Sequence, residues 1–225
     1  MCYSPQLSLL FGVIGLLSSF NLYNKNIYAS IGIGYFALME ILQYYQYKVI
    51  DQCDNNYNKF LTNIGYLHIC FQPVFVNLWL FAFTEKHNFT FIYMSLFAGV
   101  LLASRLFFVE DKELCDGNNE MLCGEKTCTF SGKRHLSWNL RLRAPGKNWW
   151  TPSMGLHFFM WTIPVLTMFE LKPILAMLLI GPYLAYFLIV RGDDRKPGET
   201  QSEAATIWCY TILGQIFFTN LFLNK

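Results

Sequence analysis

The sequence predicts an all-α integral membrane protein, a bundle of about seven transmembrane helices with one long cysteine-containing loop. Hydrophobic residue types make up 54% of the 225 residues, whereas charged types make up only 14%. A typical soluble domain carries about 25% charged residues. Mean hydropathy is +0.29, and several apolar stretches approach the roughly 20 residues that a membrane-spanning helix needs.

Seven apolar segments are candidates for these helices. Backbone amides inside a bilayer must find hydrogen-bond partners within their own segment, which favours helices. The segments occupy most of the chain and therefore predict one polytopic membrane domain over residues 1–225. The segments are Leu7 to Tyr23, Ile27 to Tyr47, Leu61 to Phe83, Phe89 to Val109, Pro152 to Phe169, Pro173 to Val190 and Ala204 to Leu223.

Local signals at the segment ends agree with this division. Thr151 followed by Pro152 suits an N-cap and the first helical position of the fifth segment. The Lys172–Pro173 pair follows the fifth segment closely, so the fifth and sixth segments should be antiparallel neighbours. Residues 110–151, between the fourth and fifth segments, are expected to form an extramembrane loop.

Seven helices place the two chain ends on opposite sides of the bilayer, and two signals disagree about which side is which. Lys and Arg residues in the long loop favour a cytoplasmic N-terminal side. The loop cysteines all fall on that same side, which favours an oxidising lumen or exterior. We expect the N-terminus and the cysteine loop to be lumenal or extracellular, with the C-terminus in the cytosol.

The loop cysteines allow three chemical states. Cys53, Cys115, Cys123 and Cys128 form an even set of four, which favours disulfides. The last three, together with His135, could instead hold zinc, but their gaps of seven, four and six residues lack the tight spacing of a zinc ribbon. Free thiols are the third alternative, and disulfides are the one we expect.

Four ionisable residues fall inside apolar segments, where such groups are costly and often mark function. They are Glu40, His68, Arg105 and His157, and the Gln43 and Gln72 amides lie one turn from Glu40 and His68. At about 1.5 Å per residue, the four lie on the order of 6–10 Å below the N-terminal side. If their faces converge, they form a polar pocket that opens toward that side. Arg105 could instead extend to the interface, and either histidine could merely bond a neighbouring helix.

Three functions fit such a pocket. The first is transport of a small solute or relay of protons, because Glu and His chains within helices serve proton pathways. The second is a metal-dependent membrane hydrolase acting on a lipid, with His68, His157 and Glu40 holding zinc. The third is a non-catalytic binding or scaffold protein. The lipid bilayer is the expected partner, a net charge of +2 gives no case for nucleic acid, and homo-oligomers are left open.

The opening Met1-Cys2-Tyr3-Ser4, followed by an apolar helix, resembles a group of uncharacterised multi-pass membrane proteins of large DNA viruses and bacteria that begin Met-Cys-x-Ser. The chain is also similar to them in the Glu40–Gln43 pair of the second segment and in Trp208-Cys209 of the last. The resemblance implies about seven helices, a site on the N-terminal side, and a viral or host membrane. It implies no activity.

Overall fold

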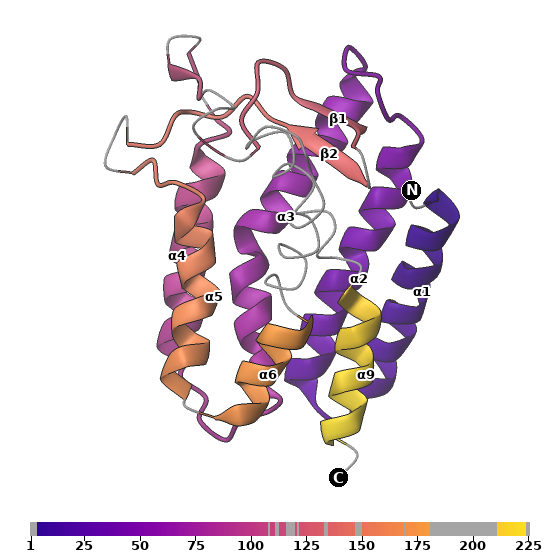
Figure 1. Ribbon diagram of the computed structural model, residues 1–225, viewed down its shortest axis with the longest axis vertical. Coiled ribbons are helices and arrows are strands. Elements are labelled where there is room, and N and C mark those ends of the chain that lie inside the picture. Colours follow the sequence, from indigo (N-terminus) through magenta and orange to yellow (C-terminus); the bar gives the residue numbers. More distant parts are fainter. Residues whose placement is uncertain are drawn as a thin grey trace.

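A computed structural model describes residues 4–107, 109–110, 113–115, 120, 122–132, 135–146, 150–168, 170–180 and 211–223, the side chains of 178–180 excepted. In this part of the chain the protein is mostly helical, with seven helices and one β-hairpin (Figure 1). The hairpin lies across one end of the bundle, the same end at which the first helix starts. The last helix, drawn in yellow, ends at the opposite end.

The helices follow one another with short connections in the first half of the chain. Their bounds are α1 Pro5–Leu22, α2 Ile27–Tyr47, α3 Asn56–Phe81, α4 Phe89–Ser104, α5 Gly155–Met168, α6 Leu171–Ile180 and α9 Ile212–Leu223. Helix α3 packs against both α2 and α4, and it also contacts α5. Helix α3 is therefore the centre of the described bundle.

Seven helices were predicted and seven are found among the described residues. Only two of them, α1 and α3, are both long and apolar enough to cross a membrane, while α4, α5 and α9 are apolar but shorter. The helical fold class is therefore established. A bundle in which all seven helices span a membrane is not established.

Asparagine side chains start three of the four N-terminal helices. Asn26, Asn55 and Asn88 each accept a hydrogen bond from a backbone N–H in the first turn, at 2.8–3.1 Å. Such caps satisfy donors that have no partner within the helix. Because Asn55 caps α3, that helix begins at Asn56, five residues before the apolar run that was predicted from Leu61.

Small residues let α1 and α2 approach closely. A Cβ placed on Gly15 would lie 2.7 Å from the Cβ of Ala37, closer than two side chains can come. Next to this contact, the Ser19 and Ser30 hydroxyls each donate to the other residue's carbonyl oxygen at 2.8 Å. Small residues and interhelical hydrogen bonds of this kind are how helices associate when hydrophobic burial is weak.

The predicted loop between α4 and α5 contains structure that the sequence did not reveal. Strands β1 (Cys128–Ser131) and β2 (Leu136–Asn139) form an antiparallel hairpin. We call the described residues of 113–146 the cap. The Asn58 amide of α3 donates to the Thr129 carbonyl at 2.9 Å and accepts from the Thr129 N–H at 2.9 Å. Strand β1 is therefore anchored to α3 by both groups of one side chain.

Two disulfides brace the cap, which confirms the predicted chemical state of the four cysteines. Cys53, between α2 and α3, bonds Cys128 of β1. Cys115 bonds Cys123 within the cap. The zinc and free-thiol alternatives for these cysteines are therefore wrong for this structure, and Cys70 of α3 is a free thiol, buried in the bundle.

Besides the start of α3, two more predicted helix ends were wrong. Helix α4 ends at Ser104 rather than Val109, because the chain turns at Arg105 to enter the cap. Helix α5 begins at Gly155 rather than Pro152. Thr151 was the expected N-cap residue of α5. Its carbonyl oxygen instead accepts the Gly146 N–H at 2.9 Å, so Thr151 belongs to the preceding loop and the helix starts later.

Several predicted features lie outside the described residues. They are the opening Met-Cys motif, the second half of the sixth segment, the loop before the seventh segment, its first residues from Ala204 and the Trp208-Cys209 pair.

Enlarging Gly99 should destabilise the contact between α3 and α4. A Cβ there would lie 2.8 Å from the backbone oxygen of Cys70, which cannot move aside as a flexible side chain can. We expect Gly99→Val to lower the free energy of unfolding by about 1–3 kcal/mol, as overpacking does. Thermal unfolding measures the change, with Val100→Leu, at an exposed neighbour, as the control. Equal stability of the two variants would contradict the packing assigned to Gly99.

Candidate functional site

Glu40 is a buried carboxyl group in the second half of α2. Its side chain is fully buried, and neither carboxylate oxygen has a hydrogen-bond partner among the described residues. The hydroxyl of Ser8 in α1 is a polar neighbour of this carboxyl group. Buried polar groups without partners are rare in native proteins and call for an explanation. Glu40 is therefore the strongest single candidate among the predicted site residues.

One turn closer to the cap, Gln43 bonds a histidine that the cap supplies. The Nε2 atom of His135 lies 3.0 Å from Oε1 of Gln43. Its Nδ1 atom lies 2.8 Å from the hydroxyl of Tyr47. Because an amide oxygen only accepts, Nε2 carries the proton, and Nδ1 accepts the hydrogen of the Tyr47 hydroxyl. The ring thus joins the cap to two residues on one face of α2.

His135 is held in its neutral form by its surroundings. The residue is 1% exposed, and burial lowers the pKa of His135 to about 3. Both ring nitrogens are used in the neutral tautomer. Gln43 and Glu40 are three residues apart and share a helix face, so polar side chains lead from the cap toward the buried carboxyl group.

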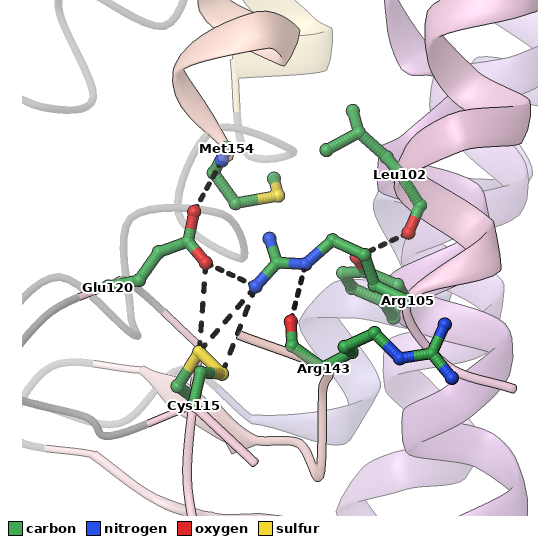
Figure 2. A network of polar contacts seen from close by, with 8 residues as sticks. Leu102, Arg105, Cys115, Glu120, Arg143 and Met154 are labelled. Atoms are coloured by element: carbon green, nitrogen blue, oxygen red, sulfur yellow. Dashed lines mark hydrogen bonds and ion pairs between the residues drawn. A yellow bond between two sulfur atoms is a disulfide. The ribbon is translucent and has the colours of Figure 1, made fainter. Parts of the chain in front are cut away.

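Arg105 and Glu120 form a buried ion pair between the end of α4 and the cap, shown in Figure 2. Glu120 also accepts the backbone N–H of Met154, just before α5. The Nε atom of Arg105 donates to the Arg143 carbonyl at 2.9 Å. Arg105 is fully buried. Of the two predicted roles for this arginine, pairing is therefore the one the structure shows, and extension to the interface is not.

The Arg105 guanidinium also lies against the Cys115–Cys123 disulfide (Figure 2). Its Nη2 atom is 3.8 Å from Sγ of Cys115 and 4.0 Å from Sγ of Cys123. Its Nη1 atom has no hydrogen-bond partner among the described residues. A cation, a carboxylate and a disulfide are thus packed together in one buried cluster.

His68 pairs α3 with α2. Its Nε2 atom lies 2.9 Å from the Tyr35 carbonyl, and the Tyr35 hydroxyl donates to the His68 carbonyl. The Tyr35 ring is stacked between the rings of His68 and Phe75, with centroids 3.8 and 3.6 Å away. His68 thus makes the interhelical hydrogen bond that was the simpler of its two predicted roles.

Gln72 and His157 lie at separate points of the bundle. Gln72 of α3 is buried, and its Nε2 atom has no partner among the described residues. His157 of α5 accepts the indole N–H of Trp161 on Nδ1 at 3.4 Å. Its ring lies against the backbone of Ile69 in α3.

The predicted zinc ligands His68, His157 and Glu40 are not brought together. Within the described residues, the one group of three potential ligand atoms that lie within 4.8 Å of one another is Cys115, Glu120 and Cys123. Two of those three are joined in a disulfide. The described structure therefore contains no ready site for the zinc of the hydrolase hypothesis.

Two cavities lie elsewhere on the molecule. One of about 500 Å³, at the end opposite the cap, is lined by Glu85, Lys86, Glu170 and Lys172 among others. The other, of about 460 Å³, is an apolar groove beside His68 and Tyr35. Neither is lined by Glu40, so the predicted polar pocket on the N-terminal side corresponds to a set of buried groups under the cap and to neither of these cavities.

Three site residues were not among those predicted: Tyr47, Glu120 and, as a partner of Gln43, His135. The helical spacing places Tyr47 on the face of Glu40 and Gln43, and what the sequence did not reveal is its partner, His135. His135 stands out as a loop histidine next to two basic residues. Glu120 is one acid among several in the loop, and nothing in the sequence distinguishes it.

A family model described as a family of unknown function (DUF5765) matches residues 6–221. No curated protein and no solved structure matches the chain.

Acidification should destabilise the protein through His135. Its folded pKa of about 3 lies below the ordinary 6.5, so the unfolded state binds a proton first as the pH falls. The contribution of His135 to the free energy of unfolding is therefore fully present above about pH 6.5 and is lost as the pH falls below it. Between pH 7 and pH 5 the loss is about 2 kcal/mol. Thermal unfolding at the two pH values measures the loss, and His135→Gln should reduce it while His87→Gln, at an exposed histidine, should not. An unchanged loss in His135→Gln would assign the effect to other groups.

Proposed function

The chain belongs to the DUF5765 family, and we propose that it is an integral membrane protein that relays protons, or passes a small polar solute, through its helical bundle. The observation that carries the proposal is Glu40, a buried carboxyl group without a hydrogen-bond partner among the described residues.

The outer surface of the bundle supports insertion in a membrane. Large apolar side chains face outward on α1, α4, α5 and α9. Phe20 is 80% exposed, Phe217 71% and Phe97 63%. Soluble monomers rarely expose apolar patches of such extent. In a membrane, lipid chains would cover these side chains, so they would not be exposed to water.

The interior of the bundle shows the complementary pattern. Buried amides and hydroxyls join helices to one another. The Asn77 amide of α3 donates to the Ser95 hydroxyl of α4 at 3.0 Å and to the Met160 carbonyl of α5 at 2.9 Å. The Trp79 indole donates to the Thr219 hydroxyl of α9 at 2.9 Å. Interhelical hydrogen bonds of this kind are expected of helices that associate in lipid.

Sidedness follows from the same proposal. Both disulfides belong to the cap, and disulfides persist in oxidising compartments. The cap and the N-terminus would then face the lumen or the exterior. The lipid bilayer is the partner that the apolar surface requires.

Glu40 is the group that would bind the transported proton or solute. An ionisable residue inside a membrane bundle marks a pathway more often than a structural role. The Gln43–His135–Tyr47 contacts connect its helix face to the cap, which supports access from that side. The hydrolase alternative lacks this support, since its three ligands are not gathered. No observation favours a scaffold role.

Placing a charge on the outer surface of α4 tests membrane insertion. Phe97→Arg should destabilise the inserted protein by about 2.5–3.5 kcal/mol, the cost of an arginine at the centre of a spanning helix. In water, a substitution at such an exposed site changes stability by only about 0.5 kcal/mol. Yield in the membrane fraction after alkaline carbonate washing provides the measurement, with Phe97→Leu as the matched control. Full recovery of Phe97→Arg, or a parent chain that washes off, would refute insertion.

Proton flux through reconstituted vesicles tests the relay. We expect the parent protein to acidify vesicles that contain a pH-sensitive dye under an imposed potential, and Glu40→Gln to lower the initial rate to that of empty vesicles. Glu85→Gln removes an exposed carboxylate at the opposite end and should leave the rate unchanged. Flux in Glu40→Gln equal to the parent would remove Glu40 from the pathway, and no flux in the parent would direct the test to small solutes.

A further inference from the structure

The Cys115–Cys123 disulfide differs from an ordinary structural crosslink in what surrounds it. The guanidinium of Arg105 contacts both sulfur atoms, at 3.8 and 4.0 Å. A neutral disulfide accepts hydrogen bonds weakly, whereas a thiolate accepts them strongly and is stabilised by a neighbouring cation. The guanidinium therefore stabilises the reduced cysteine pair more than it stabilises the disulfide.

The hydrogen-bonding capacity of Arg105 is incompletely used while the disulfide is closed. Its side chain is fully buried, and Nη1 lacks a partner among the described residues. Leaving a buried charged donor unpaired is unfavourable. Opening the disulfide would supply a thiolate beside this guanidinium, in a packed cluster where the interaction is little screened by water.

Glu120 gives the two sulfur atoms different roles. Its Oε2 atom pairs with Arg105 and lies 3.8 Å from Sγ of Cys123. Negative charge on Cys123 would face this carboxylate, whereas Sγ of Cys115 is the sulfur nearer to the guanidinium. Cys115 is therefore suited to leave as a thiolate, and Cys123 to be the sulfur that is attacked and later protonated.

We propose that Cys115–Cys123 is a redox-active disulfide that accepts two electrons from a dithiol. A thiolate of the dithiol attacks Sγ of Cys123, the S–S bond breaks, and Cys115 leaves as a thiolate beside Arg105. The second sulfur of the dithiol loses its proton and attacks the mixed disulfide, which releases Cys123. The dithiol becomes a disulfide. One of its two protons goes to solvent when the attacking thiolate forms, and the other passes to Cys123, so Cys115 remains a thiolate beside Arg105.

The exposure of the cysteines limits the size of the reductant. Cys115 is 7% exposed and Cys123 5%, so only a narrow edge of the pair is accessible. This access suits a small dithiol. Cys53 of the other disulfide is more exposed. Cys53–Cys128 therefore serves as an internal reference, a disulfide that is easier to reach.

Redox titration with dithiothreitol tests the proposal on the full-length protein. Differential alkylation followed by peptide mass spectrometry reports the reduced fraction of each cysteine pair separately. We expect Cys115–Cys123 to be reduced at a lower dithiothreitol ratio than Cys53–Cys128, although Cys53 is the more exposed. Reduction of Cys53–Cys128 first, or of both pairs only after thermal unfolding, would overturn the proposal.

Variants of Arg105 separate thiolate stabilisation from simple bracing of the cap. Arg105→Gln should make Cys115–Cys123 about tenfold harder to reduce, a shift of about 30 mV. Arg105→Lys keeps the charge and should restore most of the difference. In the reduced protein, alkylation of Cys115 by iodoacetamide should persist below neutral pH and become pH-dependent in Arg105→Gln. An unchanged Cys53–Cys128 equilibrium verifies that the cap is folded, and an unchanged Cys115–Cys123 equilibrium in Arg105→Gln would refute the role of the cation.

Discussion

The buried ion pair of Arg105 and Glu120 joins the cap to the helical bundle. Arg105 follows the last residue of α4, and its side chain gathers the carbonyl of Arg143, the carboxylate of Glu120 and both sulfur atoms of a disulfide. Glu120 in turn accepts the N–H of Met154 next to α5. Removing either partner of such a pair leaves an uncompensated buried charge, which costs about 3–5 kcal/mol. The path of the chain from α4 through the cap to α5 depends on this contact.

The interior that lies beneath the cap is held together differently. Hydrogen bonds between side chains and backbone carbonyls connect α2 to α3 at Tyr35 and His68, and α3 to α5 at Asn77. Glu40 stands apart, because its carboxyl group has no such bond among the described residues. A buried carboxyl group with neither oxygen bonded can change its partner or its protonation state. His68 uses Nε2 in an interhelical bond although its Nδ1 has no partner among the described residues, whereas neither oxygen of Glu40 is bonded there.

The sequence predicted the positions of the helices well, because long apolar runs leave little choice of structure. It placed helix ends less well. Asn55 caps α3 ahead of the apolar run, and Thr151 is used by a loop instead of a helix. The hairpin was missed because two four-residue strands carry no periodic signal, and their position is set by contacts such as those of Asn58 with Thr129.

Glu40, Gln43 and Arg105 were identifiable as polar groups in apolar surroundings, but their partners were not, since His135 and Glu120 come from a loop. The disulfide state was predictable from an even set of cysteines, whereas their pairing was not, because four cysteines allow three connectivities.

The Cys53–Cys128 crosslink joins cysteines 75 positions apart in the chain, and the segment between them includes all of α3 and α4. Both helices are therefore part of a covalently closed ring. During synthesis, Cys53 emerges long before Cys128, so the first four helices must find their places while the ring is still open. Ring closure then records that β1 has reached α3, and α5, α6 and α9 follow Cys128 in the chain. Oxidation of this pair thus marks the docking of β1 on the first helices, and a chain made in a reducing compartment would lack that covalent link.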